Sequence, residues 1–222
     1  MKNGATIGSM NYDGLLIDGK HSPDVKGVTY TQTANAEIQE VSDESTMKAS
    51  KAYASGDIIH VGDDYYTADS AIAKDADLES SGGSKNVTAL TVSAETDFIA
   101  ASGYSANDYF TLNGNLYKVK SNISAGGTIY TDTDDFPAYT IKRGTLLSVS
   151  GSDASVLISG ATPDCILADD LEVTTSGAYE VAAYKSGNFN KNMLEEIVGL
   201  TLSDANIETL RTKGIFVESV ME

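Results

Sequence analysis

The stretch YASGDIIHVGDDYYTADSAI at residues 53–72 returns in altered form as YSANDYFTLNGNLYKVKSNI at residues 104–123. In both copies two alternating apolar runs flank a tight turn, GDD in the first and NGN in the second. Asn113-Gly114 is a strong hairpin signal, because both central turn positions require positive φ. The identical residues all lie 51 positions apart: Tyr53 and Tyr104, Asp57 and Asp108, Tyr66 and Tyr117, Ser70 and Ser121, Ile72 and Ile123. The sequence therefore predicts one β-hairpin used twice, within repeats at 53–78 and 104–129.

Tyrosine is concentrated in these repeats, which hold half of the twelve in the chain. Neighbours in a strand point to opposite faces, so we expect one of Tyr65 and Tyr66 to pack and the other to meet solvent. Tyr66 and Tyr117 are equivalent, and we expect them to fill one small core that the two copies share. Exposed tyrosine rings can also stack on sugars. The candidate glycan contacts are Tyr65, Tyr66, Tyr109 and Tyr117.

Composition bounds the function. A chain of 222 residues forms one or two domains. Its net charge of −17 and its lack of Lys/Arg runs argue against nucleic acid as a partner. Cys165, the only cysteine, lies in the run CILA, where a buried apolar role is expected. The sequence has no apolar stretch of membrane-spanning length and no signal-peptide pattern, so we expect a soluble protein without a membrane partner.

The sequence contains no complete catalytic or metal-binding motif. The turn at 62–64 resembles a polymerase metal turn but has no accompanying motif, and DTDD at 132–135 lacks the glycine and final glutamate of a calcium loop. His21 and His60 stand far apart without a nucleophile motif. We therefore predict no catalytic, cofactor-binding or metal-binding residues. A hydrolase whose carboxylates cannot be singled out is the weakest alternative.

The flanks predict further strands and two helices. Residues 28–33 alternate as a half-buried strand, and 86–94 reads as another strand, followed by a helical turn at 94–102. Strands are expected within 139–150, 155–159, 164–173, 178–189 and 215–220. Asn190 caps a predicted helix at 191–198, and Ser203 caps a second that ends at Gly214. The tail is thus α+β.

Four short motifs after the repeats follow one another in a recognisable order, behind an LLID opening at 15–18. They are KRGTLL at 142–147, CILADD at 165–170, KSGNFN at 185–190 and GIFV at 214–217. This order resembles the lambda-type bacteriophage head decoration (capsid cement) protein family. The motif residues that the resemblance assigns to the family core are Arg143, Gly144, Leu167, Asp170, Gly187, Phe189, Gly214 and Phe216.

The resemblance implies a mainly β protein with a small α+β core and two short helices near the C-terminus. This core is discontinuous, formed by 13–44 plus 139–222, and an inserted all-β hairpin-repeat domain occupies 45–138. Residues 1–12 are a flexible arm. The implied function is a structural, non-enzymatic virion protein, made in the host cytoplasm, that binds the major capsid protein as a homotrimer on the outer capsid surface. The candidate capsid-binding residues of the arm are Lys2, Asn3, Ala5, Thr6, Ile7, Ser9 and Met10.

The alternative function is a carbohydrate-binding adhesin. The repeated hairpin resembles the compact aromatic hairpins of chitin-binding-type carbohydrate modules, over about 25 residues in each copy, although tryptophan is absent. In this interpretation the flanks form only a supporting domain, and the tyrosine hairpins contact a host-surface glycan. In the decoration-protein interpretation the same insert projects outward from the capsid.

Overall fold

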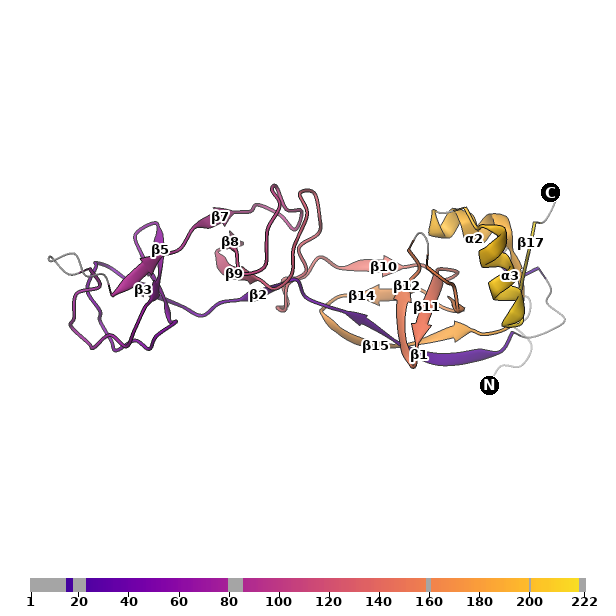
Figure 1. The fold of residues 1–222 in the computed structure, drawn as a ribbon, viewed down its shortest axis with the longest axis horizontal. Coiled ribbons are helices and arrows are strands. Elements are labelled where there is room, and N and C mark those ends of the chain that lie inside the picture. Colours follow the sequence, from indigo (N-terminus) through magenta and orange to yellow (C-terminus); the bar gives the residue numbers. More distant parts are fainter. Residues whose placement is uncertain (1–14, 18–22, 80–85, 159–160, 200, 220–222) are drawn as a thin grey trace. The chain divides into compact units, whose positions relative to one another are not determined.

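The computed structural model describes residues 15–17, 23–79, 86–158, 161–199 and 201–219. It is mainly β, and its contacts divide it into two units (Figure 1). Unit 1 comprises residues 1–32 and 138–222, and unit 2 comprises 33–137. Residues 33–44 therefore belong with the repeats rather than with the discontinuous domain, because they pair with strands of the hairpins. The candidate arm residues Lys2, Asn3, Ala5, Thr6, Ile7, Ser9 and Met10 lie outside the described residues.

A closed barrel forms the centre of unit 1. Its strands, in spatial order, are β1 (Val25–Gln32), β12 (Asp153–Val156), β11 (Leu146–Ser150), β13 (Cys165–Leu167) and β15 (Gly177–Tyr184). β1 pairs with β15 along its whole length and with β12 on its other side. The strand before the repeats thus lies between two strands that follow them. The described segments before and after the repeats therefore form one folded body.

Smaller elements complete unit 1. β10 (Tyr139–Ile141) pairs with β14 (Leu171–Val173), and β16 (Gly187–Asn190) runs parallel to β17 (Ile215–Glu218). The helices are α2 (Lys191–Val198) and α3 (Asp204–Thr212). Asn190 and Ser203 accept hydrogen bonds from backbone N–H groups of the first turns, which confirms both predicted caps. No helix in the described ranges is long and apolar enough to cross a membrane.

Unit 2 contains two four-stranded sheets, one for each hairpin. The two predicted hairpins are present: β4 (Ile58–Val61) pairs with β5 (Asp64–Ala68), and β8 (Tyr109–Leu112) pairs with β9 (Asn115–Val119). The segment 86–94 forms two short strands of different sheets instead of one strand, and 94–102 bends without a helical turn. The first sheet comprises β3 (Val41–Glu44), β4 (Ile58–Val61), β5 (Asp64–Ala68) and β6 (Val87–Ala89). The second comprises β7 (Val92–Ala94), β8 (Tyr109–Leu112), β9 (Asn115–Val119) and β2 (Ala36–Ile38).

The two modules exchange their outer strands. β2 lies 51 positions before β6, so the two strands occupy equivalent places in the repeat. β2 precedes the first hairpin yet pairs with β9 of the second, and β6 precedes the second hairpin yet pairs with β5 of the first. The registers agree, since Tyr117 faces Ile38 and Tyr66 faces Ala89. The structural repeat is therefore longer than 53–78 and 104–129. Its two copies contribute strands to each other's sheets, because β6 pairs with β5 and β2 pairs with β9.

Each module has its own apolar core, so the predicted shared core is wrong. Tyr66 packs against the first core and Tyr117 lies within the second, at equivalent positions. The first core is built from Ala49, Tyr53, Ile59, Ala68, Ile72, Leu78 and Val87. The second contains Ala36, Ala100, Tyr104, Phe110, Leu112, Tyr117, Val119, Ile123 and Ile129.

The chain crosses between the units twice, at residues 32–33 and 137–138. Within each unit, hydrogen bonds join the two chain segments next to these crossings. In unit 1 the hydroxyls of Tyr30 and Tyr139 lie 2.8 Å apart, and Tyr139 donates to Gln32 Oε1 at 2.6 Å. In unit 2 the Asn35 N–H donates to the Tyr130 carbonyl at 2.9 Å. Because the ends are already close, the insertion adds little loop-closure entropy to the folding of unit 1.

We expect unit 1 to fold after deletion of 33–137 and joining of Gln32 to Ala138 through a short Gly-Ser linker. Its barrel, helices and tyrosine contacts all lie outside the deleted segment. Circular dichroism and a cooperative thermal transition would measure this. The matched deletion of 45–138 leaves β2 and β3 without partner strands, so we expect it to aggregate more. An unfolded 33–137 deletion would contradict the prediction.

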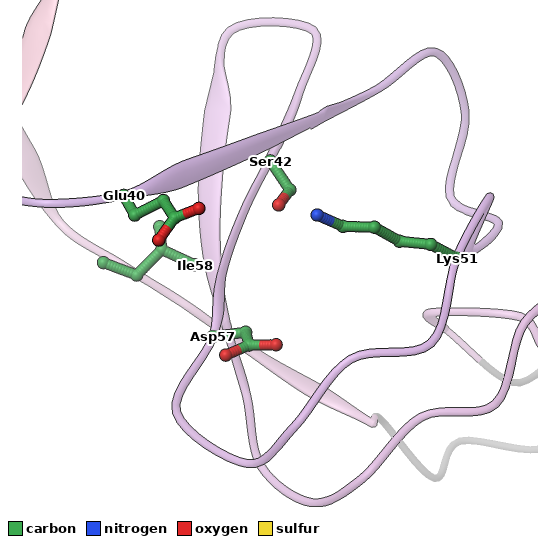
Figure 2. Close-up of a pocket in the computed structure, with 5 residues that line it drawn as sticks. All are labelled: Glu40, Ser42, Lys51, Asp57 and Ile58. Carbon is green, nitrogen blue, oxygen red and sulfur yellow. The ribbon is translucent and has the colours of Figure 1, made fainter.

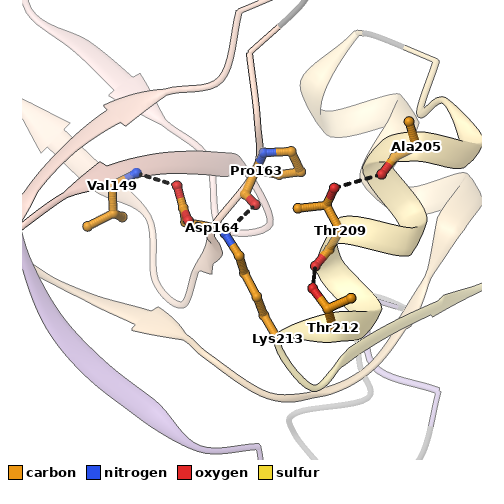
Figure 3. A network of polar contacts seen from close by, with 7 residues as sticks. All are labelled: Val149, Pro163, Asp164, Ala205, Thr209, Thr212 and Lys213. Atoms are coloured by element: carbon orange, nitrogen blue, oxygen red, sulfur yellow. Dashed lines mark hydrogen bonds and ion pairs between the residues drawn. The ribbon is translucent and has the colours of Figure 1, made fainter.

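A polar network joins α3 to the barrel (Figure 3). The Lys213 ammonium forms an ion pair with Asp164 and donates to the Pro163 carbonyl at 3.2 Å. The other Asp164 oxygen accepts the Val149 N–H at 2.8 Å. Burial alone would raise the pKa of Asp164, but the hydrogen bonds from Lys213 and Val149 hold it below its ordinary value. The network thus stabilises the end of α3 only while Asp164 is ionised.

Because its folded pKa is depressed, Asp164 contributes stability that is complete above its unfolded pKa and is lost as pH falls through the folded one. We expect Asp164→Asn to lower the free energy of unfolding near neutral pH by about 1 kcal/mol. We also expect it to flatten the decline of stability below about pH 4. Urea unfolding at several pH values would measure both. Asp24→Asn, which breaks an exposed 4.0 Å pair with Lys185, is the control with little expected effect.

Candidate functional site

The motif residues of unit 1 make direct contacts between segments far apart in sequence. The Arg143 N–H donates to Asp170 Oδ1 at 2.8 Å, and Lys142 Nζ contacts Asp170 Oδ2 at 3.0 Å. These two bonds lower the pKa of Asp170. The Arg143 guanidinium also donates to the Tyr184 hydroxyl at 3.2 Å. Asp170 therefore fastens the KRGT turn to the turn that follows β13.

Close packing explains the motif glycines. Gly144 has φ 93°, and a Cβ there would lie 2.7 Å from Ile197 Cδ1 and 3.2 Å from Leu15 Cδ1. The Gly187 N–H donates to the Gly214 carbonyl at 3.1 Å, and both residues have positive φ. Side chains at these positions would be strained and, at Gly144, would displace core atoms. The glycines thus let segments from both ends of the chain approach closely.

The apolar motif residues differ in exposure. Leu167 and Phe189 are buried, as a core position requires. Phe216, in contrast, is 43% exposed and lies outside the apolar core. Side chains alternate along a strand, and Ile215 and Val217 of β17 are the buried ones. The alternation was visible in the sequence, and it places Phe216 on the outer face of the described unit.

The candidate glycan tyrosines are not equivalent. Tyr117 is fully buried in the second core and cannot contact a glycan, which corrects that assignment. Tyr66 is half-buried against the first core, and Tyr65 stacks on His60 with ring centroids 4.4 Å apart. Tyr109 is half-buried and has the Lys118 ammonium over its ring at 6.0 Å. Of the four, Tyr109 is the one that lines a pocket described below.

Each module of unit 2 carries a surface pocket at the same place. The first has a volume of about 120 Å³ (Figure 2), and the second about 180 Å³. Five lining positions of the second pocket lie 51 residues after the five of the first. The first pocket is lined by Glu40, Ser42, Lys51, Asp57 and Ile58. The second is lined by Thr91, Ser93, Ser102, Gly103, Tyr104, Asp108 and Tyr109. Sequence reasoning missed this site, although the constant offset could have grouped its residues.

Backbone hydrogen bonds fix the aspartate of each pocket. Asp57 Oδ2 accepts the Ala54 N–H at 2.7 Å, and Asp108 Oδ2 accepts the Ser105 N–H at 2.7 Å. Both carboxylates therefore shape the loop that precedes the hairpin. Their position in the pocket wall is set by the fold and does not depend on a ligand.

A buried glutamate–tyrosine pair recurs beside each pocket. Glu44 and Glu95 are each 8% exposed, and each accepts a hydrogen bond from the tyrosine hydroxyl nine residues later, Tyr53 or Tyr104. Glu44 also accepts the Ser50 N–H at 2.7 Å. Burial alone would raise the pKa of Glu44, but these donors lower it, while burial and Glu44 raise the pKa of Tyr53 to about 12. In the first copy, Glu44 thus holds the loop at 50–53, which contributes Lys51 to the pocket, in a fixed conformation.

A raised tyrosine pKa gives stability that is complete below the unfolded pKa of about 10 and is lost as pH rises through the folded value of about 12. We expect Tyr53→Phe to lower the free energy of unfolding by about 1–3 kcal/mol at pH 7, because it removes one of the hydrogen-bond donors to a buried carboxylate. We also expect it to weaken the alkaline loss of stability. Chemical unfolding between pH 7 and 12 would measure this. Tyr65→Phe is the matched control, and equal effects of both variants would contradict the role of Tyr53.

Comparison with known proteins adds no relative. No family model matches the sequence, and no curated protein or solved structure matches it significantly. Within the described ranges, no group of three or more His, Cys, Asp or Glu residues is arranged to hold a metal ion. The function is therefore inferred from the geometry of unit 1 and from the twin pockets of unit 2.

Proposed function

We propose that this chain is a structural virion protein that decorates and stabilises an icosahedral phage capsid. The observation that carries the proposal is that the decoration-type motifs meet in one body. Asp170 binds the backbone of Arg143, Gly187 binds Gly214, and β1 lies between strands from the other end of the chain. Scattered short motifs without a shared origin have no reason to converge in this way.

In this proposal unit 1 is the body that sits on the major capsid protein as a homotrimer. The segment 2–11 is the capsid-binding arm, and pairing of its backbone with a capsid strand offsets the entropy of ordering it. Three arms on one trimer bind with avidity that one arm lacks. The net charge of −17 keeps the decorated particle from adhering to polyanions.

The test mixes purified protein with expanded, undecorated capsids of the phage that encodes it, followed by pelleting and electron microscopy. We expect the full chain to occupy local threefold positions and the 33–137 deletion to bind equally well. Deletion of 2–11 should reduce occupancy by about tenfold or more, since the avidity of the three arms is lost. Absence of the full chain from the threefold positions would contradict the proposal.

The twin pockets favour a second function for unit 2, the binding of a carbohydrate. Hydroxyl and carboxylate side chains line both pockets, and Tyr104 and Tyr109 add aromatic surface to the second. Such groups satisfy the hydroxyls of a sugar and pack on its apolar face. In a decoration protein this module would present a glycan-binding surface on the particle.

A further inference from the structure

We infer that the two pockets have diverged, so that the second binds one neutral saccharide ring and the first does not. The inference rests on the proposed carbohydrate function of unit 2 and names the site and the ligand class. It depends on three differences at equivalent positions: Lys51 against Ser102, Glu40 against Thr91, and Ile58 against Tyr109.

The lysine is the most consequential difference. The Lys51 ammonium lies over the Tyr53 ring, 5.5 Å from its centroid, and it points across the first pocket toward Ser42 (Figure 2). At the equivalent position Ser102 has a side chain too short to reach over Tyr104. Accordingly Tyr104 lines the second pocket, which is the larger of the two. Lys51 therefore fills space in the first pocket that Ser102 leaves open in the second.

Charge separates the pockets further. Lys51, Glu40 and Asp57 give the first pocket an ammonium and two carboxylates, so a neutral ring entering it would have to displace the Lys51 side chain and partly desolvate three charged groups. In the second pocket Asp108 is the only charged lining residue. That lone carboxylate accepts hydrogen bonds and repels anionic ligands.

The remaining lining of the second pocket matches a sugar. Thr91, Ser93, Ser102 and Tyr109 offer hydroxyls that both donate and accept, as the hydroxyls of a pyranose do. Tyr109 contributes an aromatic ring where the first pocket has Ile58. The volume of about 180 Å³ is below the range of about 300–1,000 Å³ for drug-sized ligands, which suits a single sugar ring.

The test titrates the full, isotope-labelled chain with neutral monosaccharides, namely glucose, galactose and N-acetylglucosamine, and with glycerol as the non-sugar control. Backbone chemical shifts in NMR spectra report the site. We expect at least one sugar to shift residues around 102–109 with a Kd on the order of 1 mM, as a ligand of this size allows. Residues around 51–58 should stay unshifted, and glycerol should have no saturable effect.

Reciprocal variants test the role of the lysine. Ser102→Lys should weaken binding at the second pocket at least about tenfold, whereas Lys51→Ser should create saturable shifts around the first pocket. Tyr109→Ile, which copies the first pocket, should weaken binding several-fold. Thermal unfolding checks that the variants are folded, and positions 51 and 102 are exposed enough to accept the exchange.

Four results would overturn the inference: no saturable shift with any of the neutral sugars, equal shifts at both pockets, unchanged binding by Ser102→Lys, or a preference for charged sugars. Capsid binding by the same variants is measured separately, because the proposed decoration function uses unit 1. If the unaltered chain binds no sugar but still binds capsids, the pocket inference alone is rejected. Charged sugars such as sialic acid serve as a further arm, and a preference for them would contradict the neutral ligand class.

Discussion

The ladder between β1 and β15 is the interaction on which the architecture depends. It runs from the Val25–Tyr184 pair to the Gln32–Gly177 pair, and it closes a barrel whose other strands all follow the inserted unit. Without it the first strand would have no partner on that side and the barrel would stay open. Because it joins residues more than a hundred positions apart, the whole of unit 2 must be accommodated as a loop. The tyrosine contacts at the end of β1 hold that loop at its base.

Local signals in the sequence predicted local structure well. Asn113-Gly114 identified the second hairpin, and Asn190 and Ser203 identified both helix starts, because turns and caps depend on a few adjacent residues. The burial of Cys165 also followed from its apolar run. The exposure of Phe216 follows from its alternation with the buried Ile215 and Val217, a pattern that the sequence itself shows.

Features that depend on distant pairing escaped prediction. The segment 86–94 looks like one strand, yet its halves pair with different sheets, and nothing local distinguishes the halves. The pockets were missed for the same reason, since Ser42, Lys51 and Asp57 meet only after the parallel β3–β4 pairing has formed. The buried Glu44 and Glu95 resemble ordinary acidic surface residues until a tyrosine hydroxyl is placed beside them. Whether a charged side chain is buried depends on contacts that form only in the folded protein.

The exchange of β2 and β6 has a consequence for how such a tandem can evolve. A stretch from β2 to β5 would lose β6, the strand that covers β5, and a stretch from β6 to β9 would lose β2, the strand that covers β9; each would leave an open sheet edge that can pair with another extended chain. The first sheet is complete in the continuous stretch from β3 to β6, whereas the second sheet needs β2, which lies before the first sheet in the sequence. The two pockets can therefore differ independently, as they do at Lys51 and Ser102, but the second module cannot be separated from the strand that precedes the first.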